Sequence, residues 1–280
     1  MCKRVQKILV LFLVFAVFSC DTAFAKHQLI WRKLAFKEEF NKPAGAPVDT
    51  SKWTAEIGGG GWGNQELEYY TNSTENAYHD GTGLLVIKAV KLTPPLSLTC
   101  WYGPCQYTSA RLITKQKFDR KYGRVEARIK IPRSQGMWPA FWLLGSDIDK
   151  VGWPNCGEID VMENIGREPS IVHGTVHGPG YSGAKGIGVA YNLPNNPVLA
   201  DGFHVYAVEW RENKIQWYID GHLYHTVTPQ NLPKGTQWVF NKPFFIILNL
   251  AVGGPWGGNP DDTSIFPGVM MIDYVRVHFR

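Results

Sequence analysis

The segment WPNCGEIDVMEN, residues 153–164, decides both the fold class and the candidate site. It holds three acids, Glu158, Asp160 and Glu163, interleaved with Ile, Val and Met. On a helix, Glu158 and Asp160 would lie about 200° apart around the axis. On a strand they share one face, and the apolar residues between them occupy the other. The pattern therefore predicts a strand with an acidic face and an apolar face.

Glu163 does not fit strict alternation along this strand. Alternation would place Met162 on the acidic face and Glu163 on the apolar one. One extra residue at Val161–Met162, forming a β-bulge, returns Glu163 to the side of the other acids. Bulges recur beside active sites because they re-aim a side chain, so we predict a bulge at this position.

Three carboxylates on one face repel one another unless they share protons, bind a cation or take part in chemistry. Trp138, Trp142 and Trp153 surround the acids in the sequence, and a solvated acidic edge strand does not require them. The spacing of a 12-residue calcium loop is absent. An acid pair flanked by aromatic residues is typical of glycosidases, and retaining enzymes hold the two carboxyl groups about 5–5.5 Å apart. The solvated edge and an irregular calcium site stay open as alternatives.

Short β-branched and aromatic runs recur along the rest of the chain between Gly, Pro, Asn and Asp clusters. The strand candidates are 84–89, 123–132, 171–177, 203–210, 214–219, 244–250 and 270–279. The run 124–131 alternates with period two, whereas 244–250 is apolar throughout except for Asn249, as in a strand buried on both faces. Asp220-Gly221 is a hairpin signal. Since no useful amphipathic helix is present, an all-β sandwich or barrel is predicted.

The N-terminus has the pattern of a secretory signal peptide over residues 1–25. Lys3, Arg4 and Lys7 precede eleven apolar residues, 8–18, and Ala-Phe-Ala ends at Ala25. Eleven residues are too few to span a bilayer, which needs about 20. We expect a secreted protein, and the alternatives are an N-terminal anchor or buried helix, and a lipid anchor at Cys20.

Composition gives little sign of a charged partner. The 280 residues are 44% hydrophobic with a net charge of +5, and loss of residues 1–25 leaves 26 basic and 23 acidic residues. This excess is too small and scattered for a nucleic-acid surface. No later segment is long enough to cross a membrane. Because no linker divides the chain, we expect a short extension over 26–34 and one catalytic domain over 35–280.

Secretion makes disulfides permissible. Cys100 and Cys105 bracket WYGP, residues 101–104, a turn-forming insert that favours pairing of the two sulfurs. A zinc site is the alternative, but it would need closer cysteine pairs. Cys156 is left over and is expected to be a small buried hydrophobic residue.

The segment GEIDVME, residues 157–163, resembles the signature of glycoside hydrolase family 16, in the longer Glu-x-Asp-x-x-Glu form of the bacterial laminarinase-like endo-β-1,3-glucanases. Further segments resemble the family in the same order: 62–71, 107–111, 136–144, 173–178 and 273–277. The resemblance covers residues 35–280. It implies a concanavalin-like β-jelly-roll sandwich of two antiparallel sheets with a concave substrate cleft.

The resemblance also implies roles for individual residues. Glu158 matches the nucleophile, Glu163 the general acid/base, and Asp160 the residue that tunes the nucleophile. The implied substrate-binding residues are Asn64, Arg111, Trp138, Trp142, Trp153, His177 and Trp256. Trp142 lies in an apolar run and fits the core as well as the cleft.

A structural calcium ion is implied at Glu39, the backbone of Gly83, and Asp273, with a solvated pair of acids as the alternative. No cofactor is implied for catalysis. The expected function is that of a secreted, monomeric, endo-acting retaining glycosidase that cleaves internal β-1,3 bonds of laminarin-like or mixed-linkage β-glucans. The alternatives are a relative acting on agar or carrageenan, and a non-catalytic lectin-like protein.

Overall fold

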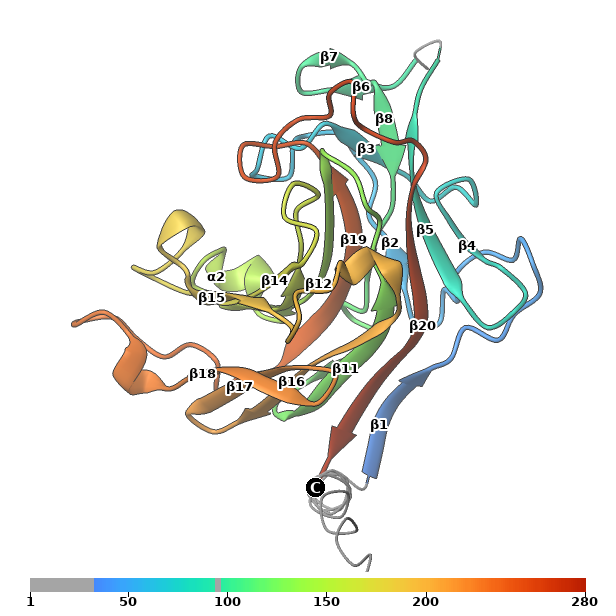
Figure 1. Ribbon diagram of the computed structural model, residues 1–280. Helices are drawn as coiled ribbons and strands as arrows, with labels where there is room; N and C mark the ends of the chain where they lie inside the picture. The colour runs from blue at the N-terminus through green and yellow to red at the C-terminus, as the bar shows by residue number, and fades with distance from the viewer. Residues whose placement is uncertain (1–32, 94–96) are drawn as a thin grey trace, which may run out of the picture.

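The structure is a computed structural model that describes residues 33–93 and 97–280. The predicted signal peptide, Cys20 and most of the predicted extension 26–34 lie outside the described residues. Strand β1 begins at Lys33, two residues before the predicted start of the domain. Almost all of the regular structure is β-strand, arranged as two sheets packed against each other (Figure 1).

The larger sheet is antiparallel except between β3 and β8, which run parallel. Its strands are, in spatial order, β18 (His222–Val227), β17 (Lys214–Ile219), β16 (His204–Arg211), β11 (Gly123–Lys130), β20 (Gly268–Phe279), β5 (Leu85–Lys91), β8 (Tyr107–Ser109) and β3 (Glu68–Tyr70), with β1 (Lys33–Glu38) beside β20 and β4 (Ala77–His79) beside β5.

The smaller sheet is antiparallel and carries the acidic segment on β13. Its strands are, in spatial order, β15 (Ile187–Asn192), β14 (Ile171–His177), β13 (Glu158–Glu163), β12 (Met137–Gly145), β19 (Phe244–Val252), β9 (Arg111–Ile113) and β2 (Thr54–Ala55), with β10 (Asp119–Arg120) beside β19.

The remaining elements are short. They are the hairpin β6 (Thr99–Cys100) and β7 (Gly103–Pro104), the helix α2 (Ile148–Val151), and the 3₁₀ turns Gly183–Lys185, Leu199–Asp201 and Pro229–Asn231. The predicted Cys100–Cys105 disulfide is present and closes the β6–β7 hairpin. Asp220 and Gly221 both have positive φ, 48° and 80°, as the predicted tight hairpin between β17 and β18 requires.

Binary patterning explains how the two sheets stack. Val125, Ala127 and Ile129 of β11 point into the core, while Arg124 and Glu126 pair on the outer face. The main core lies between the sheets and takes side chains from strands of both. The prediction of an all-β sandwich of two sheets is therefore confirmed.

Strand β19 is buried along its whole length, as its apolar sequence predicts. Its residues Leu248 and Leu250 face the core between the sheets. Phe245 and Ile247 point the opposite way and pack in a second cluster that contains Cys156. Cys156 is fully buried, as expected from the sequence.

The site lies on the face of the smaller sheet turned away from the larger sheet, which we call the catalytic face. It is defined by Glu158, Asp160 and Glu163 of β13, Trp142 of β12 and Arg111 of β9. No helix in residues 33–93 or 97–280 is long and apolar enough to cross a membrane.

Candidate active site

The predicted bulge is present in β13. Trp142 of β12 lies opposite Asp160, and Phe141 lies opposite Met162, so Val161 is the additional residue. Val161 and Met162 are both fully buried in the core between the sheets. Two consecutive residues thus face the core, and Glu163 returns to the catalytic face.

A tryptophan of the larger sheet holds this bulge. Trp217 of β17 is fully buried, and its Nε1 donates a hydrogen bond to the backbone oxygen of Asp160 at 2.7 Å. A buried carbonyl group needs a hydrogen-bond donor. At a bulge the regular backbone pairing between strands is disrupted, so the indole of Trp217 supplies the donor instead. The larger sheet therefore fixes the backbone from which the acids project.

Each of the two glutamates accepts a hydrogen bond from an indole. Trp153 Nε1 donates to Glu158 Oε2 at 2.9 Å, and Trp138 Nε1 donates to Glu163 Oε1 at 3.0 Å. Trp138 is buried, whereas Trp153 is 48% exposed. The two donors orient the carboxylates from opposite ends of the strand without adding charge.

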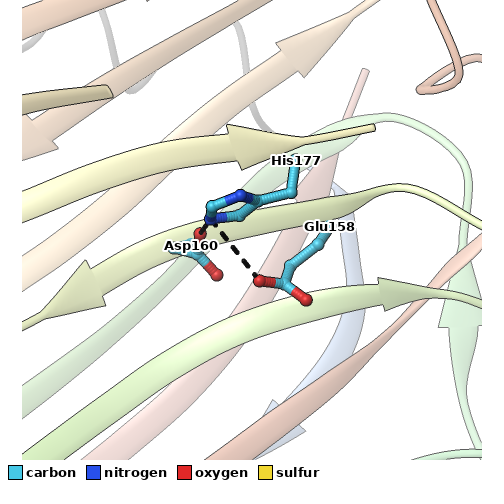
Figure 2. Close-up of side chains that lie close together, drawn as sticks. All are labelled: Glu158, Asp160 and His177. Atoms are coloured by element: carbon cyan, nitrogen blue, oxygen red, sulfur yellow. Dashed lines mark ion pairs between the residues drawn. The ribbon is translucent and has the colours of Figure 1, made fainter. Parts of the chain in front are cut away.

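His177 of β14 faces the acids (Figure 2). Its Nε2 lies 3.2 Å from Asp160 Oδ2 and 3.7 Å from Glu158 Oε1. One ligand atom from each of these three residues lies within 4.8 Å of the others, which makes them the one cluster of this kind in residues 33–93 and 97–280. Such a group can hold a cation or exchange protons.

Burial raises the pKa of all three carboxyl groups. The pKa of Glu158 and that of Asp160 are each raised to about 8, and that of Glu163 is raised well above its ordinary value. The charge of Asp160 raises the pKa of both glutamates further, whereas His177 lowers it. Protons are therefore retained in the cluster near neutral pH, which allows one acid to donate a proton while another acts as nucleophile.

Aromatic side chains lie beside Glu163. The rings of Trp138 and Trp256 meet edge to face at 5.0 Å, and His173 meets Trp256 in the same way at 5.0 Å. Ile165 is fully buried in this cluster. These residues form an apolar wall at the end of β13 that carries Glu163.

On the other side of β12, Arg111 lies between two indoles. Its guanidinium group is 4.8 Å from the ring of Trp62 and 4.8 Å from the ring of Trp142. Glu56 forms an ion pair with Arg111. The structure thus places Trp142 on the catalytic face rather than in the core between the sheets.

A polar chain that the sequence analysis did not identify links Asn64 to Trp142. Asn64 Nδ2 donates to Glu66 Oε1 at 3.0 Å, and Tyr70 Oη donates to Glu66 Oε2 at 3.0 Å. Asn249 Nδ2 donates to Tyr70 Oη at 3.1 Å, and Asn249 Oδ1 accepts from Trp142 Nε1 at 2.7 Å. Asn249 is the one polar residue in the otherwise apolar run 244–250, and this was the feature of the sequence that could have indicated a buried polar network.

The sequence-predicted site residues thus fall into two places. The three acids and the seven substrate-binding candidates gather on or around the catalytic face, and Trp62 joins them there. The three calcium candidates lie on or beside the larger sheet: Glu39 directly follows β1, Asp273 is on β20, and Gly83 is in the loop before β5.

The two carboxylates among the calcium candidates form ion pairs with arginines in this structure. Both oxygens of Glu39 accept hydrogen bonds from Arg276, at 2.8 and 2.9 Å, and Arg276 lowers the pKa of Glu39. Asp273 Oδ2 accepts from Arg128 at 2.7 Å. Carboxylates neutralised in this way do not fit the oxygen cage of a hard cation, so the calcium site stays a prediction.

Comparison with known proteins gives a consistent result. Residues 64–276 match the model of the family described as glycosyl hydrolases family 16. The chain is 41% identical over 254 residues to the β-glucanase of Rhodothermus marinus, covering 88% of this chain and 85% of that protein. It is 41% identical over 275 residues to glucan endo-1,3-β-glucosidase A1 of Niallia circulans, covering 92% of this chain but 39% of that protein.

A solved structure extends this similarity to three dimensions. The endo-β-1,3-glucanase of Pyrococcus furiosus superposes with a TM-score of 0.83 at 51% identity, covering 89% of this chain and 94% of that one. The motif around β13, the two-sheet fold and these matches agree along most of the chain. The chain therefore belongs to glycosyl hydrolase family 16.

Proposed function

We propose that this protein is an endo-acting, retaining glycoside hydrolase that cleaves internal β-1,3-glucosidic bonds in laminarin-like or mixed-linkage β-glucans. The observation that carries the proposal is the pair Glu158 and Glu163, brought to one face by the bulge and each oriented by an indole N–H. The relatives named above as β-glucanase and endo-1,3-glucanases support the substrate class.

In the first step, Glu158 attacks the anomeric carbon while Glu163 transfers its proton to the glycosidic oxygen. The bond between carbon and oxygen breaks, the leaving sugar departs as an alcohol, and the glycosyl group is bound to Glu158. In the second step, Glu163 takes a proton from water, and the resulting hydroxyl group replaces Glu158 at the anomeric carbon. Two displacements restore the original configuration.

Asp160 and His177 adjust the charge on the nucleophile. The carboxylate of Asp160 raises the pKa of Glu158, and His177 opposes this effect. His177 also lies within 3.7 Å of Glu158 Oε1. The balance between the two neighbours sets the fraction of Glu158 that is ionised when substrate arrives.

The aromatic and polar groups suit a neutral sugar chain. A sugar ring offers apolar C–H faces and polar rims, so its binding site needs planar aromatic rings beside fixed hydrogen-bond groups. Trp138 and Trp256 supply rings beside Glu163, and Trp142 supplies one beside Asp160. Asn64 and Arg111 are held in position by Glu66 and Glu56, which leaves them oriented for hydroxyl groups.

A lectin-like role is the competing function from another class. Burying three acids together costs stability. A protein that only binds sugar would make no catalytic use of this cluster. An agar- or carrageenan-degrading relative would use the same acids, but the similar proteins named above are glucan enzymes. A glucanase and an agar- or carrageenan-degrading enzyme therefore differ here only in substrate, which an activity assay can determine.

The test measures reducing-sugar release from laminarin, mixed-linkage β-glucan, cellulose and agarose by the wild type and by Glu158→Gln. Glu75→Gln is the control, because it neutralises an exposed acid that pairs with Lys88 away from the site. We expect release from laminarin by the wild type and Glu75→Gln only, with proton NMR showing β-configured product first. Binding of laminarin without release by any variant would favour the lectin, and release from agarose alone would change the substrate.

Secretion and the calcium ion need separate tests. N-terminal sequencing of the exported protein should give a sequence that begins at Lys26. Incorporation of labelled palmitate that is lost in Cys20→Ala would instead support the lipid anchor.

For calcium, a rise in Tm with added CaCl₂ that Asp273→Asn abolishes would support the site. An unchanged Tm would show that Arg128 and Arg276 satisfy these acids alone. Light scattering of the pure protein tests the expected monomer.

A further inference from the structure

The disulfide-closed hairpin β6–β7 presents an exposed tryptophan that the catalytic steps do not use. Cys100 and Cys105 are both buried, but Trp101 between them is 50% exposed. A single exposed aromatic ring is common on protein surfaces, so a role for Trp101 depends on what surrounds it.

Several contacts fix the orientation of Trp101. Its Nε1 donates to the backbone oxygen of Glu66 at 2.8 Å, and its backbone N–H donates to Gly59 O at 2.8 Å. A Cβ atom on Gly61 would lie 2.9 Å from Cδ1 of the indole, so the glycine backbone packs directly against the ring. Tyr102 donates to Leu67 O at 2.6 Å and holds the next residue of the hairpin. One edge of the indole is anchored, and the rest of the ring stays available.

Trp101 lines a pocket between two loops. The pocket has a volume of about 220 Å³ and is lined by Gln65, Leu67, Trp101, Gly254, Pro255, Gly258 and Asn259. This volume is below the roughly 300–1,000 Å³ of a site that encloses a whole small molecule. A pocket of this volume suits one unit of a polymeric ligand whose other units bind elsewhere on the protein.

The chemistry of the lining matches a sugar. An indole ring and Pro255 supply apolar surface, and the amides of Gln65 and Asn259 supply hydrogen-bond groups. Asn259 Oδ1 accepts from Gly254 N at 3.2 Å, and the Gln65 amide has no hydrogen-bond partner within the described part of the chain. None of the lining residues is charged, so a neutral polyhydroxylated ligand fits better than an ion.

The pocket adjoins the catalytic face. A Cβ atom on Gly254 would lie 2.8 Å from the backbone oxygen of Asn64 and 3.7 Å from the ring of Trp138. Trp138 in turn donates to Glu163. In Figure 1 the β6–β7 hairpin lies beside the loop that follows β19, at the same end of the molecule as β3 and β8. A glucan bound at the acids can therefore extend into this pocket.

We propose that this pocket is a distal sugar-binding site, in which Trp101 stacks against a glucosyl unit of the chain whose other part lies at the acids. The inference rests on the proposed glucanase function and adds a determinant of chain-length preference to it. Because the contact lies away from the reacting bond, it strengthens binding of ground state and transition state alike. It therefore lowers KM for long chains without changing kcat.

The test compares laminarin with a short β-1,3-linked glucose trimer as substrates for the wild type, Trp101→Ala and Tyr102→Phe. For Trp101→Ala we expect kcat/KM on laminarin to fall about tenfold through KM, a loss of about 1.4 kcal/mol. We expect kcat/KM on the trimer to stay unchanged. Tyr102→Phe removes the hydrogen bonds that the hydroxyl group donates to Leu67 O and accepts from Gln106 N but keeps Trp101, so it should match the wild type on both substrates.

Three results would overturn the inference. An equal loss on both substrates, or an equal loss in Tyr102→Phe, would show that the hairpin only supports the loop that carries Asn64. No loss on either substrate would show that the pocket binds no sugar. Thermal unfolding of each variant separates these results from misfolding. If the wild type itself releases nothing from laminarin, the proposed function fails, and the binding of laminarin by Trp101→Ala relative to wild type still decides whether the pocket holds glucan.

Discussion

Replacing Trp217 by Phe tests whether the larger sheet positions the acids. The substitution removes the indole N–H that donates to Asp160 O at 2.7 Å, in a side chain that is fully buried. Leaving a buried carbonyl without its partner costs about 1–3 kcal/mol. The atoms removed and the space left behind add about 1–2 kcal/mol. The sum is about 2–5 kcal/mol, so we expect Tm to fall by about 4–20 °C, since 1 kcal/mol corresponds to about 2–4 °C in a chain of this size.

The same substitution should reduce kcat more than stability alone explains. Relaxation of the bulge moves Asp160 and Glu163 relative to Glu158, and displacement of a catalytic group by about 1 Å can cost about 100-fold in rate. We therefore expect kcat on laminarin to fall about 10- to 100-fold at a temperature where the variant is fully folded. The pH profile should change as well, because the spacing of the acids sets their pKa values.

Trp210→Phe is the matched control. Trp210 lies on β16 of the same sheet, is 1% exposed, and donates through Nε1 to a backbone oxygen, that of Phe240, at 2.9 Å. It should lose similar stability and keep its kcat and its pH profile. The reasoning would be refuted if Trp217→Phe were destabilised but fully active, or if both variants lost activity to the same extent.

Three further predictions concern titratable groups. His177→Gln should move both limbs of the pH profile of kcat/KM to higher pH, because His177 lowers the pKa of Glu158 and of Glu163; an unmoved profile would contradict this role. Glu163→Gln should be inactive but should melt higher than the wild type at pH 8 and not at pH 4, as scanning calorimetry can measure. The native wild type retains a proton that the unfolded chain releases above its ordinary pKa, so stability falls as pH rises through that window, and Gln has no such loss. The Cys156 thiol, whose pKa burial raises to about 11, should react with Ellman's reagent at pH 8 only after unfolding, and rapid labelling of the native protein would show that β13 opens.

The sequence was sufficient to predict features that depend on neighbouring residues along one strand. The bulge follows from the spacing of Asp160 and Glu163, because an apolar residue between them had to be turned inward. The pairing of Cys100 with Cys105 follows from a short turn between them. These features need no knowledge of how the sheets stack.

Features that depend on stacking or on crossing between strands could not be predicted in the same way. Trp217 lies 57 residues from Asp160, and only the packing of β17 under β13 brings the two together. Asn249 and Tyr70 are 179 residues apart and meet because β19 of the smaller sheet lies close to the end of β3 of the larger one. Periodicity reports which face a side chain occupies but not which strand lies opposite it.

The choice of hydrogen-bond donors explains how one glutamate can remain a proton donor in this cluster. A guanidinium or ammonium group beside Glu163 would stabilise the ionised form and lower its pKa. Trp138 instead offers a neutral N–H, which orients the carboxyl group while burial still raises its pKa. Arg111, the cation on the same face, is engaged by Glu56 and lies between two indoles, and it lowers the pKa of Glu158 less than His177 and Trp153 do. Replacing Trp138 by a cationic side chain should therefore abolish proton donation near neutral pH even where substrate still binds.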